Sequence, residues 1–175
     1  MGFGRIAAII GATVGLLSII LSLILPELFC WYSYTVTNIS SLNKSGHYLT
    51  GFGTTTSIPY STAISGIALL ELIGGFLVIL GAIVCIVGVT KEENKIGAIG
   101  GILILIGPVL LLADFLIGIS EYYEYVAFIQ SIVANKNILW DTVSSFGFSY
   151  TWNLWIGFFM AVAGGVLGTI GGATL

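Results

Sequence analysis

The chain has 175 residues, of which 57% are hydrophobic and only 7% carry a charged side chain. A typical soluble domain has about 25% charged residues, and a disordered chain combines low hydrophobicity with high net charge, so both classes are excluded. Five Lys and Arg against eight Asp and Glu give a net charge of −3. This excludes a basic surface for nucleic acid and leaves an integral membrane protein.

The first predicted element is a membrane-spanning helix over residues 6–25, which contains no charge and ends at Pro26. A bilayer core about 30 Å thick requires roughly 20 apolar residues. A cleaved signal peptide is the alternative, but the segment is long for one and no small-residue cleavage motif follows it. The same criterion predicts three further helices, over residues 63–89, 96–119 and 154–173. Residues 1–175 are therefore expected to form a single four-span membrane domain.

Residues 27–62 are predicted to lie outside the bilayer and to form a small antiparallel sheet. Two runs, residues 31–37 and 47–56, are rich in aromatic and β-branched residues and are separated by turn-forming residues. This pattern is typical of paired strands. Asn38 and Asn43 each begin an Asn-X-Ser sequon, so both are candidate N-glycosylation sites.

Two acids lie inside the predicted spans, Glu71 in the second helix and Asp114 in the third. The two helices are joined by residues 90–95, so they run antiparallel as neighbours, with both acids at similar depth in the outer leaflet. Because the spans contain no Lys, Arg or His, the two carboxyls are expected to share a proton. A charge in hydrocarbon is costly and marks a functional site. The two interpretations are a proton or cation relay, and a protonated or water-bonded pair that serves packing.

Residues 120–153 form the second predicted outer loop. The helical pattern of the third span continues to about residue 134, and residues 138–150 then return to the fourth helix. All four Trp and all eight Tyr fall in or beside the two outer loops. The predicted outer aromatic surface consists of Trp31, Tyr32, Tyr34, Trp140 and Trp152.

Small residues recur at four-residue spacing in the helices, which lets helix backbones approach closely. The predicted helix-packing or oligomerisation positions are Gly11, Gly15, Gly164, Gly168 and Gly172. One interpretation is that they pack the four helices against one another. The other is that they form a surface where a second copy or a partner subunit docks.

The distribution of basic residues predicts the orientation. Three of the five lie at the N-terminus or in the short loop of residues 90–95, whereas two are spread over the longer loops. The prediction is a plasma-membrane protein with both termini in the cytoplasm and residues 27–62 and 120–153 outside.

The arrangement resembles the claudin/PMP22-like tetraspan superfamily over nearly the whole chain. The resemblance rests on four helices with both ends inside, a strand-forming first loop, a short second connection and an outward third helix. Leu25-Pro26 before an aromatic cluster adds local similarity. The Gly-Leu-Trp motif and cysteine pair of the claudin first loop are missing, because that loop contains only Cys30 and the other cysteine, Cys85, lies in the second helix.

The residues and the resemblance together predict an all-α membrane protein. It is expected to be a four-helix transmembrane bundle with a small extracellular β-sheet from the first outer loop and an outward extension of the third helix.

No enzyme, metal or cofactor is expected, because the one histidine, His47, has no set of catalytic or metal-ligating residues around it. The leading hypothesis is a structural, adhesion or accessory subunit acting through its extracellular loops and Gly-rich helix faces. Its expected partners are the lipid bilayer and copies of itself or other membrane subunits. One alternative is a small proton or cation channel or transporter using Glu71 and Asp114. The other is a lateral subunit of a larger energy-converting membrane complex.

Overall fold

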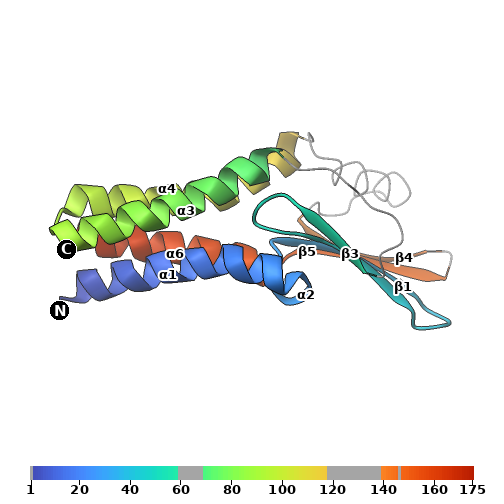
Figure 1. Cartoon of the computed structure of the whole chain (residues 1–175). Helices are drawn as coiled ribbons and strands as arrows, with labels where there is room; N and C mark the ends of the chain where they lie inside the picture. The colour runs from blue at the N-terminus through green and yellow to red at the C-terminus, as the bar shows by residue number, and fades with distance from the viewer. Residues whose placement is uncertain (1, 59–68, 118–138, 146) are drawn as a thin grey trace.

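The computed structural model describes residues 2–58, 69–117, 139–145 and 147–175, in which four long helices carry a β-sheet at one end (Figure 1). The four helices are α1 (Phe3–Ile24), α3 (Leu69–Lys91), α4 (Asn94–Ile117) and α6 (Ile156–Ala173). Each is long and apolar enough to cross a membrane. The two chain ends lie together at the end of the bundle opposite the sheet (Figure 1).

The four helices therefore match the four predicted spans, and the part of the second span before Leu69 lies outside the described residues. Along the bundle, α3 packs on α4, α4 on α6, and α6 on α1. At the end opposite the sheet, Arg5 forms an ion pair with Glu92 in the connection between α3 and α4. Asn94 Nδ2 donates a hydrogen bond of 3.3 Å to the Ala173 carbonyl. These contacts tie the ends of all four helices together.

Glycines bring the backbones of α3 and α4 into contact at regular intervals. A Cβ added to Gly74 would lie 2.9 Å from the Gly107 carbonyl oxygen, and one added to Gly81 would lie 2.6 Å from the Gly100 carbonyl oxygen. The next contact toward the chain ends is closer still, because a Cβ added to Gly88 would lie 2.2 Å from Gly97 N. Any larger residue would separate the two helices at these points.

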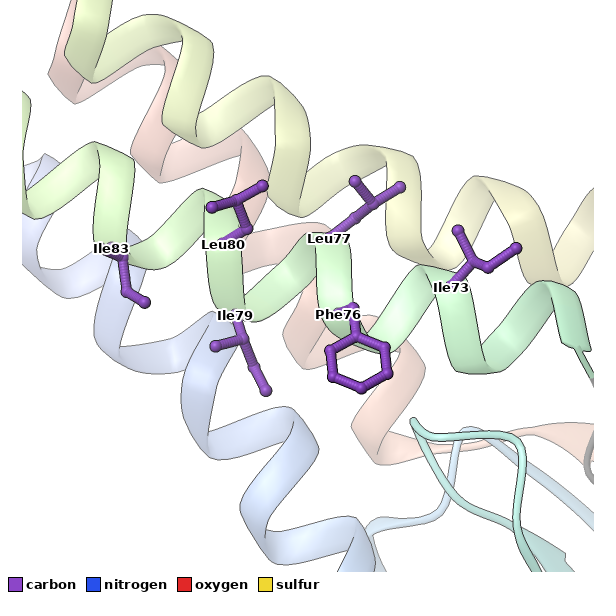
Figure 2. Close-up of a pocket in the computed structure, with 6 residues that line it drawn as sticks. All are labelled: Ile73, Phe76, Leu77, Ile79, Leu80 and Ile83. Atoms are coloured by element: carbon purple, nitrogen blue, oxygen red, sulfur yellow. The ribbon is translucent and has the colours of Figure 1, made fainter.

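The outward faces of the helices are apolar. A shallow groove of about 430 Å³ lies on α3. Figure 2 shows the side chains that line it, which are Ile73, Phe76, Leu77, Ile79, Leu80 and Ile83. At its end near the sheet, Phe76 packs edge-on against Phe52, with ring centroids 5.5 Å apart. Surfaces of this kind match the apolar interior of a bilayer.

Within the described residues, the sheet has five antiparallel strands in the order β3-β2-β1-β5-β4. They are β1 (Tyr32–Asn38), β2 (Lys44–Leu49), β3 (Thr55–Ile58), β4 (Trp140–Ser145) and β5 (Phe148–Leu154). The central strand β1 follows the short helix α2 (Pro26–Phe29) and pairs with both β2 and β5. Strands from the two outer segments therefore form one sheet (Figure 1).

The sheet was predicted from the first outer segment, whose strands were expected to lean on the second outer segment or on a neighbour; the structure shows that the second segment adds strands to the same sheet. Residues 138–150 were expected to return directly to the fourth helix, but β4 and β5 form a hairpin that turns at Gly147, whose φ is +81°. Two isolated strands are marginally stable in water, so the second hairpin extends the sheet formed by the first segment. The predicted strand over residues 47–56 is divided into β2 and β3 by a turn that contains Gly53, with φ +68°. The predicted extension of the third helix to residue 134 lies outside the described residues.

Candidate functional site

Glu71 and Asp114 lie together at the sheet end of the bundle. Glu71 is two residues from the described start of α3, and Asp114 is three residues from the described end of α4. Their exposed fractions are 0% and 2%, and the two groups are close enough for their charges to interact. The structure therefore brings together the two acids that the sequence analysis singled out.

Among the described residues, no basic side chain compensates the buried acid pair. Within the described residues, no hydrogen bond of normal geometry reaches either oxygen of Glu71 or Oδ2 of Asp114. Arg5 and Lys91, by contrast, lie at the opposite end of the bundle. Two buried carboxylates at close range repel each other strongly, so at least one of them carries a proton.

The pair lies between the glycine contacts of the bundle and the aromatic core of the sheet. Next to Asp114, the Phe115 ring packs against Tyr32 with ring centroids 4.5 Å apart. Two turns toward the chain ends, a Cβ on Gly107 would meet the Trp31 ring at 3.3 Å. A carboxyl pair in this position can hold a proton between two helices or accept a small cation from the sheet end.

The aromatic residues that were predicted to form an outer surface mostly form the core of the sheet. Trp31, Tyr32 and Trp152 are 0% exposed, Tyr34 is also buried, and only Trp140 is on the surface, at 57%. The prediction of a surface was wrong for the other four because it relied on their position in or beside the outer loops, which does not distinguish exposed from buried aromatic residues. A sheet outside the membrane needs a buried face of its own, and these side chains provide it.

The five predicted glycines lie in contacts between helices of one chain. A Cβ added to Gly11 would lie 2.3 Å from Gly168 N, and one added to Gly164 would lie 2.6 Å from Gly15 N. One at Gly172 would lie 2.2 Å from the carbonyl carbon of Gly97. All five are buried, so of the two interpretations the contacts favour packing within the bundle.

The two sequon asparagines flank the turn between β1 and β2. Asn38 Oδ1 accepts hydrogen bonds from the backbone N–H groups of Ser40 and Ser41, at 3.0 and 3.2 Å, and from the Ser40 hydroxyl at 2.7 Å. This local arrangement is an Asx turn. Asn43 is exposed, which makes it the more accessible of the two candidate glycosylation sites.

The remaining residues with reactive side chains are placed for structure. His47 stacks on Tyr34 across β1 and β2, with ring centroids 6.1 Å apart, and burial lowers its pKa. No group of three or more metal-ligating side chains occurs within the described ranges. Cys30 and Cys85 are both buried and free. Burial raises the pKa of the Cys30 thiol to about 12, so it remains protonated at neutral pH.

Sequence reasoning missed a polar groove on the sheet that is bordered by Ser33, Thr35, Tyr48 and Asn153. The available signal was the alternation of small hydroxyl residues with tyrosine and valine along residues 32–37. Comparison of the chain with models of protein families and with curated proteins finds no match. The functional argument therefore depends on the geometry of the acid pair, the sheet and this groove.

Proposed function

We propose that this chain is a non-enzymatic, multi-pass membrane protein that serves as a structural, adhesion or accessory subunit. It uses the sheet to contact other protein chains, either copies of itself or subunits of a larger membrane complex. The observation that carries the proposal is the five-stranded sheet at one end of a closely packed bundle. A sheet held in this way presents a fixed surface beyond the membrane.

The glycine contacts support a structural function. They keep α3 and α4 in backbone contact from Gly74 to Gly88. Four helices packed at such short range make a compact anchor, and the residues left for recognition are those of the sheet and of the apolar outer faces.

We also propose the orientation in which both termini are cytoplasmic, the sheet is extracellular and the membrane is the plasma membrane. The shared position of the chain ends supports a common side for both termini (Figure 1), and the basic residues near them support the cytoplasmic side. Membership of the claudin/PMP22-like superfamily is part of the same proposal. Its support is the combination of four apolar helices with a sheet at one end.

Trp140 is the residue best placed to anchor a partner. It is 57% exposed on β4, which ends the described sheet at one side. Edge strands offer unpaired backbone groups to a second chain, and Trp is enriched among residues that dominate binding energy.

The experiment is chemical cross-linking of the full chain in intact membranes, with and without Trp140→Ala. We expect the substitution to weaken association at least tenfold, which corresponds to about 1.4 kcal/mol. Phe3→Ala is the matched control, because Phe3 is an exposed aromatic residue at the opposite end of the bundle. Equal cross-linking of wild type and Trp140→Ala would contradict a contact through this strand.

One observation favours a second candidate function, which is proton or cation transfer at Glu71 and Asp114. Both oxygens of Glu71 are buried without a hydrogen-bond partner among the described residues, and a neutral amide in their place would have no proton to release and no negative charge to hold a cation. Glu71→Gln is therefore expected to abolish any proton-coupled conductance in liposomes. Unchanged flux in this variant would exclude the relay, and the packing contact between α3 and α4 would remain as the function of the pair.

A further inference from the structure

A polar groove of about 470 Å³ lies on one face of the sheet, beside α2. Its walls come from β1, β2 and β5, from α2, and from Trp155 immediately before α6. Pockets for small molecules typically measure about 300–1,000 Å³. Because α1 ends at Ile24 and α6 begins at Ile156, the groove begins where the helices would leave the membrane.

The floor of the groove is polar because alternate residues of a strand face opposite sides of a sheet. Ser33 and Thr35 of β1 line the groove, whereas Tyr34 between them lies in the buried core. The register places Asn153 beside Ser33 and Thr151 beside Thr35. Two neighbouring strands thus present a row of hydroxyl and amide groups.

Aromatic rings border this polar row. Gly46 pairs with Thr35 in the sheet, and a Cβ added to Gly46 would lie 2.4 Å from Tyr48 Oη. The Tyr48 side chain therefore lies across the glycine, and Trp155 is a second aromatic residue of the lining. Sugar rings suit such a surface, because their C–H faces pack on aromatic rings while their hydroxyls exchange hydrogen bonds with Ser, Thr and Asn.

One buried donor in the groove lacks an acceptor. The Ser33 hydroxyl donates to Asn153 Oδ1, and the hydroxyls of Thr142 and Thr151 share a hydrogen bond of 3.2 Å. Trp155 Nε1, however, is buried with no acceptor in the described part of the chain. An unsatisfied buried N–H is unfavourable, so a turn of the Trp155 ring that brings Nε1 to a ligand oxygen in the groove would supply a hydrogen bond that the described part of the chain does not make.

The charges of the groove favour a neutral ligand. Its lining includes one acid, Glu27, and one base, Lys44. Burial raises the pKa of Tyr48, and the negative charge of Glu27 raises it further, so Tyr48 keeps its hydroxyl proton at neutral pH. Because Glu27 and Lys44 carry opposite charges, the lining has no net charge to attract an anion or a cation, and an uncharged polyol can bind through its donors, acceptors and rings.

We propose that this groove binds a neutral sugar ring, supplied either by the head group of a membrane glycolipid or by a soluble saccharide. The groove is formed within one chain, so the proposal does not rest on the association proposed above. In either case the ring would lie against Tyr48 and Trp155 and contact the hydroxyl row of β1.

The test uses the full chain in three kinds of nanodisc: phosphatidylcholine alone, phosphatidylcholine with a glucosyldiacylglycerol, and phosphatidylcholine with phosphatidylglycerol. Native mass spectrometry reports which lipid stays bound to the protein. A separate arm titrates maltose into the phosphatidylcholine nanodiscs and follows tryptophan fluorescence. Trp155→Phe and Tyr48→Phe each remove one donor and keep an aromatic ring. Tyr150→Phe is the matched control, because Tyr150 lies on the other face of β5.

We expect one of the two sugar arms to give specific binding that Trp155→Phe and Tyr48→Phe each weaken by about three- to tenfold, the effect of one hydrogen bond. Tyr150→Phe should bind as the wild type does. Retention of the glycolipid identifies a lipid head group as the source of the sugar ring. A response to maltose without retention of the glycolipid identifies a soluble saccharide as the source. Absence of binding in both sugar arms, preferential retention of phosphatidylglycerol, or equal weakening by Tyr150→Phe would overturn the proposal.

Discussion

Single glycines determine how closely the helices approach, because their missing side chains let two backbones touch. Gly11 shows this across α1 and α6, where an added Cβ would lie 2.3 Å from Gly168 N. The obstructing atom belongs to a helix backbone and cannot rotate away as the end of a flexible side chain could. Even alanine would therefore force α1 away from α6.

We expect Gly11→Ala to lower the free energy of unfolding by about 1–3 kcal/mol, the usual range for overpacking. The measurement is reversible unfolding of the full chain in bicelles. Gly2→Ala is the control, since a Cβ at Gly2 meets nothing within 4 Å. Equal stability of the two variants would contradict the packing of α1 on α6.

Cys30 allows a test of burial near the base of the sheet. Its thiol is 0% exposed, and its pKa is raised to about 12, whereas maleimides react with the thiolate. We expect no labelling at pH 8 in the folded protein and full labelling after denaturation, measured by mass in a Cys85→Ala background. Rapid labelling of the folded protein would contradict the buried position.

The same residue gives a pH dependence with a defined sign. The pKa of Cys30 in the folded state, about 12, lies above the ordinary value of 9.0 for a cysteine thiol. The unfolded chain therefore releases this proton first, and the contribution of Cys30 to stability falls as the pH rises from about 9 toward 12. Below about pH 9 the Cys30 thiol is protonated in both the folded and the unfolded state, so it adds no pH dependence to the stability.

At the scale of elements, the pairing of β1 with β5 is the feature that joins the two outer segments. Ser33 and Asn153 are partners in this register, although 120 positions separate them in the chain. In a Cys30→Ala and Cys85→Ala background, we expect Ser33→Cys with Asn153→Cys to form a disulfide on mild oxidation. A proteolytic cut between the two positions followed by non-reducing electrophoresis detects the link.

The control for this cross-link is Ser33→Cys with Ser149→Cys. Ser149 lies on β5, as Asn153 does, but it pairs with Thr37 rather than with Ser33. The cysteines at positions 33 and 149 should therefore stay apart. Efficient cross-linking of the control, or none in the Ser33 and Asn153 pair, would contradict the register.

The sequence predicted the helices better than it predicted the sheet, and the physical reason is locality. A run such as α6 contains nearly all the information that makes it a membrane-spanning helix, because length and hydrophobicity decide that outcome. The hairpin of β4 and β5 depends on β1, a partner more than 100 residues away, and residues 138–150 alone do not reveal it. The burial of Trp152 depends on the same distant pairing.

The candidate sites were predictable to different degrees. Glu71 and Asp114 could be found because ionisable residues are rare in apolar spans, and the short loop between their helices predicted their proximity. The polar groove joins three strands, a short helix and Trp155. Its alternating hydroxyl residues are visible in the sequence, but their assembly with Tyr48 and Trp155 requires the register.

At the scale of the whole molecule, one end of the bundle carries the chain termini and the other carries the sheet (Figure 1). The glycine contacts close the bundle on itself, so contacts with other proteins would use the sheet and the apolar outer faces. The acid pair and the polar groove both lie toward the sheet end, which makes that end the functional half of the molecule in this account.

The most direct test of the central claim is the native mass of the full chain extracted from its membrane in a lipid-preserving polymer, with identification of every protein that copurifies. We predict a mass above that of one 18.5 kDa chain, either from several copies or from defined partner subunits, and its reduction by Trp140→Ala. A strictly monomeric species that conducts ions in vesicles would contradict the structural function and support the relay at Glu71 and Asp114.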